Sequence, residues 1–300
     1  MPRQARTRRK NNVLLRWKWV AGVGIVLVVV TLAATARGAS RGGKRISVWW
    51  DIGGAPTIRY LSRHIANLKS LGVSGVVVML NDYHNSQSFT SNFTGQELAT
   101  FASALRANRI DLGLDSWVFP SRQYVESLPE MFPLASLSGA QFIEFDVEWN
   151  WSSSQVNGYS DLDEAAGHVA QVMSRSPVPW GITTVPERPA SRTLGRYGSF
   201  MVPQAYSVVG SDEPNGAFPG SYQVKVYNQI RKTYGGMPVV MGLAAYDQAF
   251  PGVDPASAMV TAARASFGLV DEVRFWSWKW IGGVDGNPRN RYAFDALARL

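Results

Sequence analysis

Short strand-like stretches alternate with helix-like stretches across most of the chain, and this alternation limits the fold more than any other feature of the sequence. The strand-like stretches are apolar and rich in Val, Ile, Phe and Trp, as in ISVWW and GVVVM. The helix-like stretches repeat apolar residues every three or four positions, for example at Leu61, Ile65, Leu68 and Leu71, and Gly72 then ends that helix. The pattern predicts an α/β protein.

The number of predicted strands points to one architecture within that class. We expect strands at residues 46–54, 74–82, 111–119, 140–149, 178–186, 199–207, 238–246 and 272–280, and helices at 57–72, 95–109, 121–132, 161–176, 222–236 and 254–268. Eight strands with helical crossovers in about 250 residues is the count of a TIM (β/α)8 barrel. A doubly wound open sheet is the alternative, but no GxGxxG motif follows the first strand. No linker interrupts residues 46–300, so we predict one barrel domain there.

Residues 1–45 differ in character from the predicted barrel. A basic leader precedes the apolar run VAGVGIVLVVVTLAATA, which is 17 residues long and matches an export signal. Ala34-Thr35-Ala36 resembles a signal-peptidase site, whereas Trp17 and Trp19 could hold an uncleaved segment at the membrane interface. A cleaved signal and a retained membrane anchor both fit, and either predicts that the barrel is exported with the positive end left in the cytoplasm.

The net charge of +8 does not indicate a nucleic-acid-binding protein. Eleven of the 30 basic residues and none of the 22 acidic residues lie in residues 1–45, which leaves 19 basic against 22 acidic residues in the rest. A domain with this balance lacks the basic surface that binds phosphate backbones. The chain has no cysteine, which excludes disulfides, thiol nucleophiles and cysteine-based metal sites.

Aromatic and polar residues concentrate where the predicted strands end, and a TIM barrel builds its sites on that face. The group comprises Trp49, Trp50, Asp51, Asn81, Asp82, Asp115, Trp117, Asp146, Glu148, Trp149, Gln204, Tyr206, Tyr246, Trp276 and Trp278. Aromatic rings stack on the apolar faces of sugars, so we take Trp149 and Trp278 as candidate substrate contacts. Asp82 and Asp115 are candidate sugar contacts at strand ends.

The stretch AQFIEFDVEWNW places two acids at the end of one strand. Side chains two positions apart share a strand face, so Asp146 and Glu148 are predicted to point into the mouth, with Glu144 one step deeper. Neighbouring carboxylates repel when ionised, which raises the pKa of one of them. A carboxylic acid that stays protonated near neutral pH can protonate a glycosidic oxygen. A salt-bridge network at the strand end is the alternative.

FIEFDVEW resembles the fourth-strand signature DxxDxDxE of the chitinase family, glycoside hydrolase family 18. Other stretches are similar to that family in the same order along the barrel: ISVWWDIGG to the opening strand of the plant-type chitinase/lysozymes, GITTVPE to the fifth strand, VPQAYS to the sixth and VRFWSWKW to the closing strand. MGLAAY is similar to the seventh strand of the broader family. The resemblance extends along the barrel in order, from the first predicted strand to the last.

The resemblance implies roles for individual residues. Glu148 aligns with the general acid, and Asp146 with the residue that orients the N-acetyl group of the substrate. That group, not the protein, is the nucleophile in this family, and the reaction proceeds with retention through an oxazolinium intermediate. Gln204 and Tyr206 would hydrogen-bond the N-acetyl group, and Trp276 would form the floor beneath the distorted sugar.

The sequence also departs from the family pattern. Gln141 and Glu144 stand where the signature has Asp, and Gln141 is expected outside the site. The D-x-E ending and Asp51 are also similar to the barrel lysozymes of glycoside hydrolase family 25. Both families cut β-1,4 bonds between N-acetylated hexosamines. Peptidoglycan is the favoured polymer, because the chain is targeted outward and carries no separate chitin-binding module.

Several alternatives stay open at this point. Glu187, after the fifth strand, could be the nucleophile of a two-carboxylate retaining pair with Glu148, or an ion-pair partner of Arg188. A non-catalytic carbohydrate-binding barrel would be signalled by loss of the terminal acid, but Glu148 is present. A scaffold that serves as an interaction surface would leave the aromatic residues at the mouth unexplained. No metal or cofactor is expected, because the three histidines show no HxH or HExxH spacing.

Overall fold

The computed structural model describes residues 43–53, 58–81, 86–186, 191–206, 218–246, 250, 252–288 and 290–300. Lys44–Leu300 forms one compact unit. The predicted signal or anchor, with its basic leader, lies outside the described residues. Of the helices that the structure does describe, none combines the length and apolarity needed to cross a membrane.

Eight parallel strands form the centre of this unit, as the alternation in the sequence predicted. They are β1 (Arg45–Trp50), β2 (Gly75–Met79), β3 (Asp111–Trp117), β4 (Ile143–Val147), β5 (Trp180–Thr184), β6 (Met201–Pro203), β7 (Met241–Ala244) and β8 (Glu272–Trp276). Their order is β6-β5-β4-β3-β2-β1-β8-β7. Isolated bridges between Met201 and Val239 and between Gln204 and Gly242 join the two ends of this order. The sheet is a nearly closed TIM barrel, so the prediction of fold class is confirmed and the open-sheet alternative is wrong.

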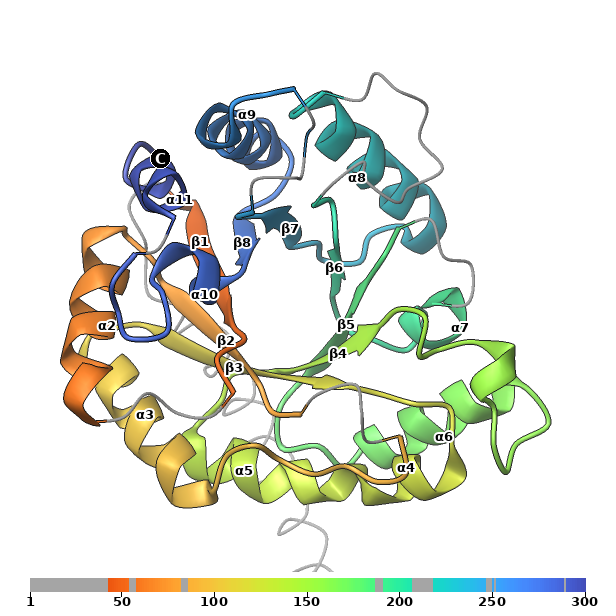
Figure 1. Ribbon diagram of the computed structural model, residues 1–300. Coiled ribbons are helices and arrows are strands. Elements are labelled where there is room, and N and C mark those ends of the chain that lie inside the picture. The colour runs from red at the N-terminus through yellow and green to blue at the C-terminus, as the bar shows by residue number, and fades with distance from the viewer. Residues whose placement is uncertain are drawn as a thin grey trace, which may run out of the picture. The chain divides into compact units, whose positions relative to one another are not determined.

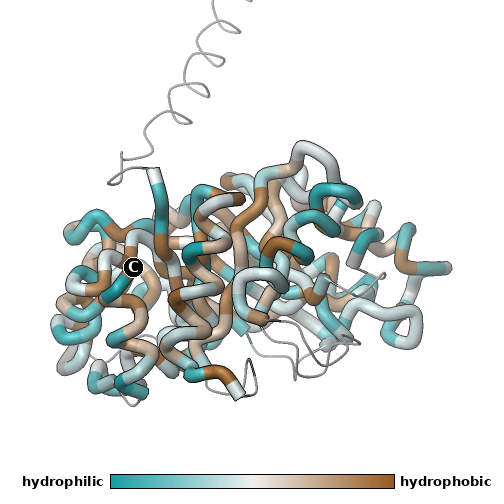
Figure 2. Tube along the Cα trace, turned by 90° about the horizontal axis from the view of Figure 1, so that it is seen from above, coloured by the Kyte–Doolittle hydropathy of each residue, from teal (hydrophilic) through white to brown (hydrophobic). Residues whose placement is uncertain are grey.

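Helices surround the strands in an outer layer (Figure 1). The helices are α2 (Ile58–Ser70), α3 (Gly95–Ala107), α4 (Arg122–Ser127), α5 (Met131–Ser138), α6 (Leu162–Met173), α7 (Ser191–Gly195), α8 (Ser221–Tyr234), α9 (Pro255–Phe267), α10 (Trp278–Ile281) and α11 (Arg291–Leu297). The described residues also contain two 3₁₀ turns, η2 (Leu128–Glu130) and η3 (Ser153–Gln155). Figure 2 shows hydrophobic residues in the interior of this unit, where the buried core lies.

Three predicted elements have different limits in the structure. The helix predicted at 121–132 breaks into α4, η2 and α5, because Pro129 has no N–H to continue the first helix. The strand predicted at 199–207 is only the three residues of β6. The strand predicted at 272–280 ends at Trp276, and Trp278 begins the helical turn α10. The short helix α7 follows β5, where no helix was predicted.

The buried apolar side chains form two separate clusters, one outside the sheet and one inside the barrel. A large cluster lies between strands and helices, whereas Trp49, Val77 and Val202 form a smaller cluster inside the barrel. Glycines on the strands make room for the rings inside it. A Cβ atom on Gly113 would lie 2.3 Å from the ring of Phe142, and one on Gly242 would lie 3.2 Å from Trp49. The lumen is therefore a packed core, and barrels of this kind bind ligands at the mouth.

Candidate active site

Three acids of β4 and its end point along the inside of the barrel. Glu144 and Asp146 contact residues of the lumen, whereas Phe145 packs against Trp180 in the outer layer, with ring centroids 5.8 Å apart. Glu144 and Asp146 are buried, and Glu148 at the end of the row is half-buried. The row thus runs from the packed interior to the open mouth, in the alternation expected of a strand.

Glu144 is neutralised by Arg274, a residue that sequence reasoning missed. The two form a fully buried ion pair, and the indole N–H of Trp49 donates to Glu144 Oε1 at 3.0 Å. Arg274 also pairs with Glu272, with Nη2 and Oε1 3.0 Å apart. Its guanidinium lies 5.3 Å from the ring centroid of Trp49 and 5.2 Å from that of Phe142. The period of two in Glu272, Arg274 and Trp276 could have indicated that all three face inward.

Asp115 adds a fourth carboxyl group to the row. It lies on β3, in register with Glu144 of β4, and is completely buried. Neither of its oxygens has a hydrogen-bond partner in the structure. Burial raises the pKa of Asp115 well above its ordinary value, and the charge of Glu144 raises it further. Because Asp115 is completely buried, it is not open to the sugar contact predicted for it.

Asp146 accepts a hydrogen bond from Gln204. The resemblance implied that both residues belong to one site. Gln204 Nε2 donates to Asp146 Oδ1 at 3.1 Å, which joins β4 to the end of β6. Burial raises the pKa of Asp146 well above its ordinary value, and the charges of Glu148 and Asp115 add to the shift. The hydrogen bond from Gln204 favours the charged form and opposes this shift.

Asn150 orders the turn that carries Glu148, and sequence reasoning missed it too. Its side-chain oxygen accepts the backbone N–H of Glu148 at 2.8 Å. Its amide nitrogen donates to the carbonyl oxygens of Val118 and Asp146, the second at 3.1 Å. An Asn two residues after the acid is a local signal, because such side chains often bond to nearby backbone.

Aromatic rings line the mouth opposite these acids. Tyr206 stacks on Trp276 with ring centroids 6.4 Å apart and an interplanar angle of 25°, and Trp49 contacts both rings edge-on. Burial raises the pKa of Tyr206 well above its ordinary value, and the charges of Asp146 and Glu148 reinforce the shift. The phenol is thus a neutral O–H donor. Tyr206, Gln204, Asp146 and Trp276 come together in one site.

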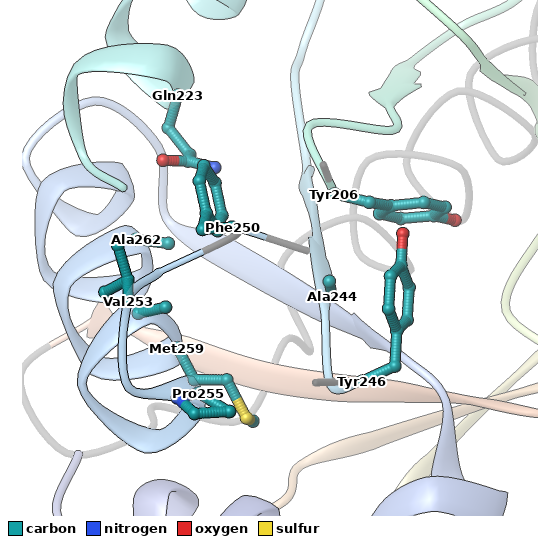
Figure 3. A pocket seen from close by; sticks show the side chains of 10 residues that line it. Tyr206, Gln223, Ala244, Tyr246, Phe250, Val253, Pro255, Met259 and Ala262 are labelled. Atoms are coloured by element: carbon teal, nitrogen blue, oxygen red, sulfur yellow. The ribbon is translucent and has the colours of Figure 1, made fainter. Parts of the chain in front are cut away.

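A small cavity lies behind Tyr206, between β7 and the helices α8 and α9 (Figure 3). Its walls are mainly apolar and include Ala244, Phe250 and Met259, and its volume of about 10 Å³ suits a single water molecule. Gln223 lines it and donates to the carbonyl of Ala205 at 2.8 Å. The cavity is too small for a sugar.

Asp51 and Trp278 both make hydrogen bonds within the fold. Asp51 Oδ1 accepts the backbone N–H of Lys279 at 3.2 Å and so holds the turn α10 after β8. Burial raises the pKa of Asp51 above its ordinary value. Trp278 is completely buried and donates to Nδ1 of His64 at 2.9 Å. Trp278 therefore has no exposed ring face for a sugar. It is the first residue of α10 and does not continue strand β8.

His64 predicts a measurable dependence of stability on pH. It accepts from Trp278 and lies 3.3 Å from the carbonyl oxygen of Val284, which requires the neutral ring with the proton on Nε2. Burial lowers the pKa of His64 below 6.5. The unfolded chain therefore takes up a proton that the folded chain does not as pH falls below about 6.5, which destabilises the fold.

We expect the difference in unfolding free energy between the wild type and His64→Gln to shrink as pH falls from 7.5 to about 5.5. Urea unfolding at both pH values measures it. The buried carboxyl groups act in the opposite direction, but they are present in both proteins and cancel. A difference that does not change with pH would contradict the assignment of a neutral His64.

The other residues singled out in the sequence lie at the end of β4, outside the site or outside the described residues. Trp149 is 40% exposed at the end of β4, beside Trp117. Gln141 is exposed and lies outside the site. Glu187 and Asp82 lie outside the described residues. Within the described parts of the barrel, no group of three or more His, Asp or Glu side chains is arranged to hold a metal ion.

Comparison with solved structures finds the same fold in proteins of very different sequence. A glycoside hydrolase family 113 β-mannanase from Alicyclobacillus acidocaldarius is 10% identical, with a TM-score of 0.55 over 88% of this chain and 98% of that chain. A domain of a thermostable chitinase from Pyrococcus furiosus is 13% identical, with a TM-score of 0.54 over 87% and 95% of the two chains. The spore cortex-lytic enzyme of Bacillus megaterium is 12% identical, with a TM-score of 0.52 over 86% and 74%. The sequence matches no protein-family model and no curated protein. The similarities establish the TIM-barrel fold.

Proposed function

We propose that this protein is a glycoside hydrolase that cleaves β-1,4 bonds in polymers of N-acetylhexosamine. The observation that carries the proposal is the row of carboxyl groups that rises from the buried pair of Glu144 and Arg274 to the half-buried Glu148. Burial and the neighbouring carboxylates raise the pKa values of Asp115 and Asp146 behind it. Glu148 is the member of the row that reaches solvent and a substrate.

The proposed chemistry assigns one step to each group at the mouth. Glu148 donates its proton to the glycosidic oxygen as the bond to the leaving sugar breaks. The N-acetyl oxygen of the substrate attacks the anomeric carbon, and Asp146 stabilises the positive charge that develops on the N-acetyl nitrogen. Tyr206 donates its neutral O–H to the N-acetyl group, and Trp276 supports the sugar ring. Glu148 then takes a proton from the water that opens the intermediate, and the anomeric configuration is retained.

Similar solved structures support this class of reaction. Their names include a chitinase, a spore cortex-lytic enzyme and a β-mannanase, all with the same fold. The resemblance of FIEFDVEW to the chitinase signature favours the substrate-assisted route, since the N-acetyl group then supplies the nucleophile. A pair of Glu148 and Glu187 is the two-carboxylate alternative, and the experiments below separate the two.

The test of the proposed function is sugar release from chitin oligomers and from purified peptidoglycan. We expect new reducing ends with the β configuration immediately after cleavage, read by proton NMR, because both steps invert the same carbon. A thiazoline mimic of the cyclised sugar should inhibit more strongly than the parent sugar, since it copies an intermediate that the site holds. Retention without thiazoline inhibition would discard substrate assistance and favour the pair with Glu187. No sugar release from either polymer would contradict the function.

Peptidoglycan is the favoured polymer, because the leader of residues 1–45 predicts export to the cell wall. A periplasmic reporter fused after residue 45 should be active outside the cytoplasm. Changing the arginines of the leader to glutamate should reduce that signal, because a positive leader stays on the cytoplasmic side. A reporter that stays active only in the cytoplasm would contradict the prediction of export.

A further inference from the structure

Three buried polar side chains lie where the neighbouring strands β2, β3 and β4 end. They are Asn81, Tyr124 and Asn150, and we call them the strand-end clamp. Tyr124 and Asn150 are completely buried and Asn81 is 4% exposed, so none of them is open to a sugar. Burying a polar side chain costs free energy unless it is hydrogen-bonded, so the partners of these three groups indicate their role.

The strand ladder stops just before Glu148. The register of β4 ends at Asp146 on the side of β3 and at Val147 on the side of β5. Glu148 is the next residue and is half-buried at the mouth. Its position therefore depends on bonds other than those of the regular ladder.

Asn150 supplies such bonds on both sides of Glu148. Its Oδ1 accepts the backbone N–H of Glu148 at 2.8 Å, and its Nδ2 donates to the carbonyl oxygen of Asp146 at 3.1 Å. The same Nδ2 donates to the carbonyl oxygen of Val118, which follows β3. The carbonyl oxygen of Glu148 accepts the backbone N–H of Trp151 at 3.2 Å. The turn is thus closed on itself and tied to the neighbouring strand end.

Tyr124 and Asn81 fix the strand end to which Asn150 is tied. The carbonyl oxygen of Trp117, one residue before Val118, accepts the hydroxyl of Tyr124 at 2.6 Å. The backbone N–H of Trp117 donates to Asn81 Oδ1 at 2.9 Å, and Asn81 Nδ2 donates to the hydroxyl of Tyr124 at 2.7 Å. The clamp therefore continues the connection between β2, β3 and β4 beyond the point where their ladder ends.

We propose that the strand-end clamp holds Glu148 where it can donate its proton, so that Asn81, Tyr124 and Asn150 are positioning residues for the reaction. The inference rests on the proposed function and extends it to three residues that touch no substrate. A general acid must lie within hydrogen-bond distance of the oxygen that it protonates. A displacement of about 1 Å can cost about 10²-fold in rate, so the bonds that fix the turn bear directly on turnover.

The clamp is neutral, which suits a place beside a row of carboxyl groups. The side chains of Asn81 and Asn150 are amides and carry no charge. Burial raises the pKa of Tyr124 to about 12, so its hydroxyl keeps its proton. The clamp can therefore order the backbone of Glu148 without adding a charge that would shift the pKa of the acid.

The first test compares Asn150→Ala with Asn67→Ala on N-acetylglucosamine oligomers. Asn67 is the matched control, because its amide also orders a loop, donating to the carbonyl oxygen of Gly286 at 2.8 Å, but that loop carries no candidate catalytic group. We expect Asn150→Ala to lose about 10²-fold in kcat and Asn67→Ala to stay within about twofold of the wild type. Titration calorimetry should show that the affinity for the oligomer changes little in either variant.

Combining variants separates positioning from a general loss of structure. If Asn150 acts through Glu148, adding Asn150→Ala to Glu148→Gln should cost little beyond Glu148→Gln alone, because the acid that it positions is already gone. Tyr124→Phe removes one hydroxyl and keeps the ring, so it serves if Asn150→Ala folds poorly. We expect Tyr124→Phe to lose about tenfold in kcat, and again little on top of Glu148→Gln. Losses that multiply would overturn the inference.

Asn150→Asp adds a signature in the pH dependence. A protonated aspartic acid has one acceptor oxygen and one O–H donor and can replace the amide, whereas the ionised form has no donor. Burial favours the protonated form. We expect kcat of this variant, divided by that of the wild type, to be highest at acid pH and to fall as pH rises. A ratio that does not change with pH would count against the clamp.

The outcomes distinguish this inference from the proposed function. A wild type that releases no sugar contradicts the proposed function, and the catalytic role of the clamp with it. An active wild type, with Asn150→Ala and Tyr124→Phe matching Asn67→Ala in kcat, overturns the clamp and leaves the hydrolase standing.

Discussion

Glu148→Gln should lose about 10²- to 10⁴-fold in turnover on oligomers of N-acetylhexosamine, because it removes the proton that the leaving oxygen needs. Gln and Glu have the same shape, and the backbone N–H of residue 148 keeps its bond to Asn150. Binding of the oligomer should therefore change little while kcat falls, which initial rates and titration calorimetry measure separately. Asp146→Asn should also reduce kcat, since its partner is the N-acetyl group.

Glu130→Gln is the matched control for this change. Glu130 is an exposed glutamate at the end of the η2 turn, so the same loss of charge should leave turnover within about twofold of wild type. Full activity in Glu148→Gln would remove the catalytic role of this strand. Activity lost in Glu187→Gln instead, where substrate assistance predicts almost no effect, would make the two-carboxylate mechanism the better account.

Arg274→Met should destabilise the barrel by about 3–5 kcal/mol, because it leaves the charge of Glu144 buried without its partner. Arg274 is fully buried, so water cannot replace the guanidinium. The double variant Arg274→Met/Glu144→Gln removes both charges and should recover much of that stability. Urea unfolding at pH 7 measures the unfolding free energies of the single and the double variant. If the single variant folds poorly, a stable double variant still tests the prediction.

The exposed pair of Arg196 and Asp163 is the control for the buried one. Arg196 Nη2 lies 2.7 Å from Asp163 Oδ1, and both side chains are about half exposed. Arg196→Met should cost less than about 1 kcal/mol, since solvent screens such pairs. An equal cost for Arg196→Met and Arg274→Met would mean that burial does not set the strength of the ion pair at Arg274.

The fold and the line of acids could be predicted from local pattern. The alternation of apolar stretches is set by burial on both faces of parallel strands, so eight strands and their helices were readable. The strand period of two places Asp146 and Glu148 on one face wherever that strand lies. The same rule applies to Glu272, Arg274 and Trp276, and it could have directed attention to Arg274.

The rest depended on contacts between residues far apart in the sequence. Trp278 was assigned to the mouth because it is an aromatic residue at the end of the predicted strand 272–280. In the structure Asp51 holds Lys279 in a helical turn there, which local propensity does not specify. The bond from Trp278 to His64 joins residues 214 positions apart. The buried acid Asp115 needed the register of β3 against β4, which only the folded barrel defines. Tertiary packing overrode local pattern at each of these places.

We expect the join between β6 and β7 to open more easily than the other strand joins of the barrel. The β6 strand is three residues long and is held to β5 by a regular ladder, but it meets β7 through isolated bridges. Amide hydrogens at this seam should exchange with solvent through local opening, at a lower free energy than those of β1 to β4. Gln204 and Tyr206 follow β6 directly. The groups proposed to bind the N-acetyl group therefore lie next to the join where local opening is expected. The acids stand on β4, deep in the continuous ladder, and the site thus combines a fixed proton donor with a wall that can adjust to its ligand.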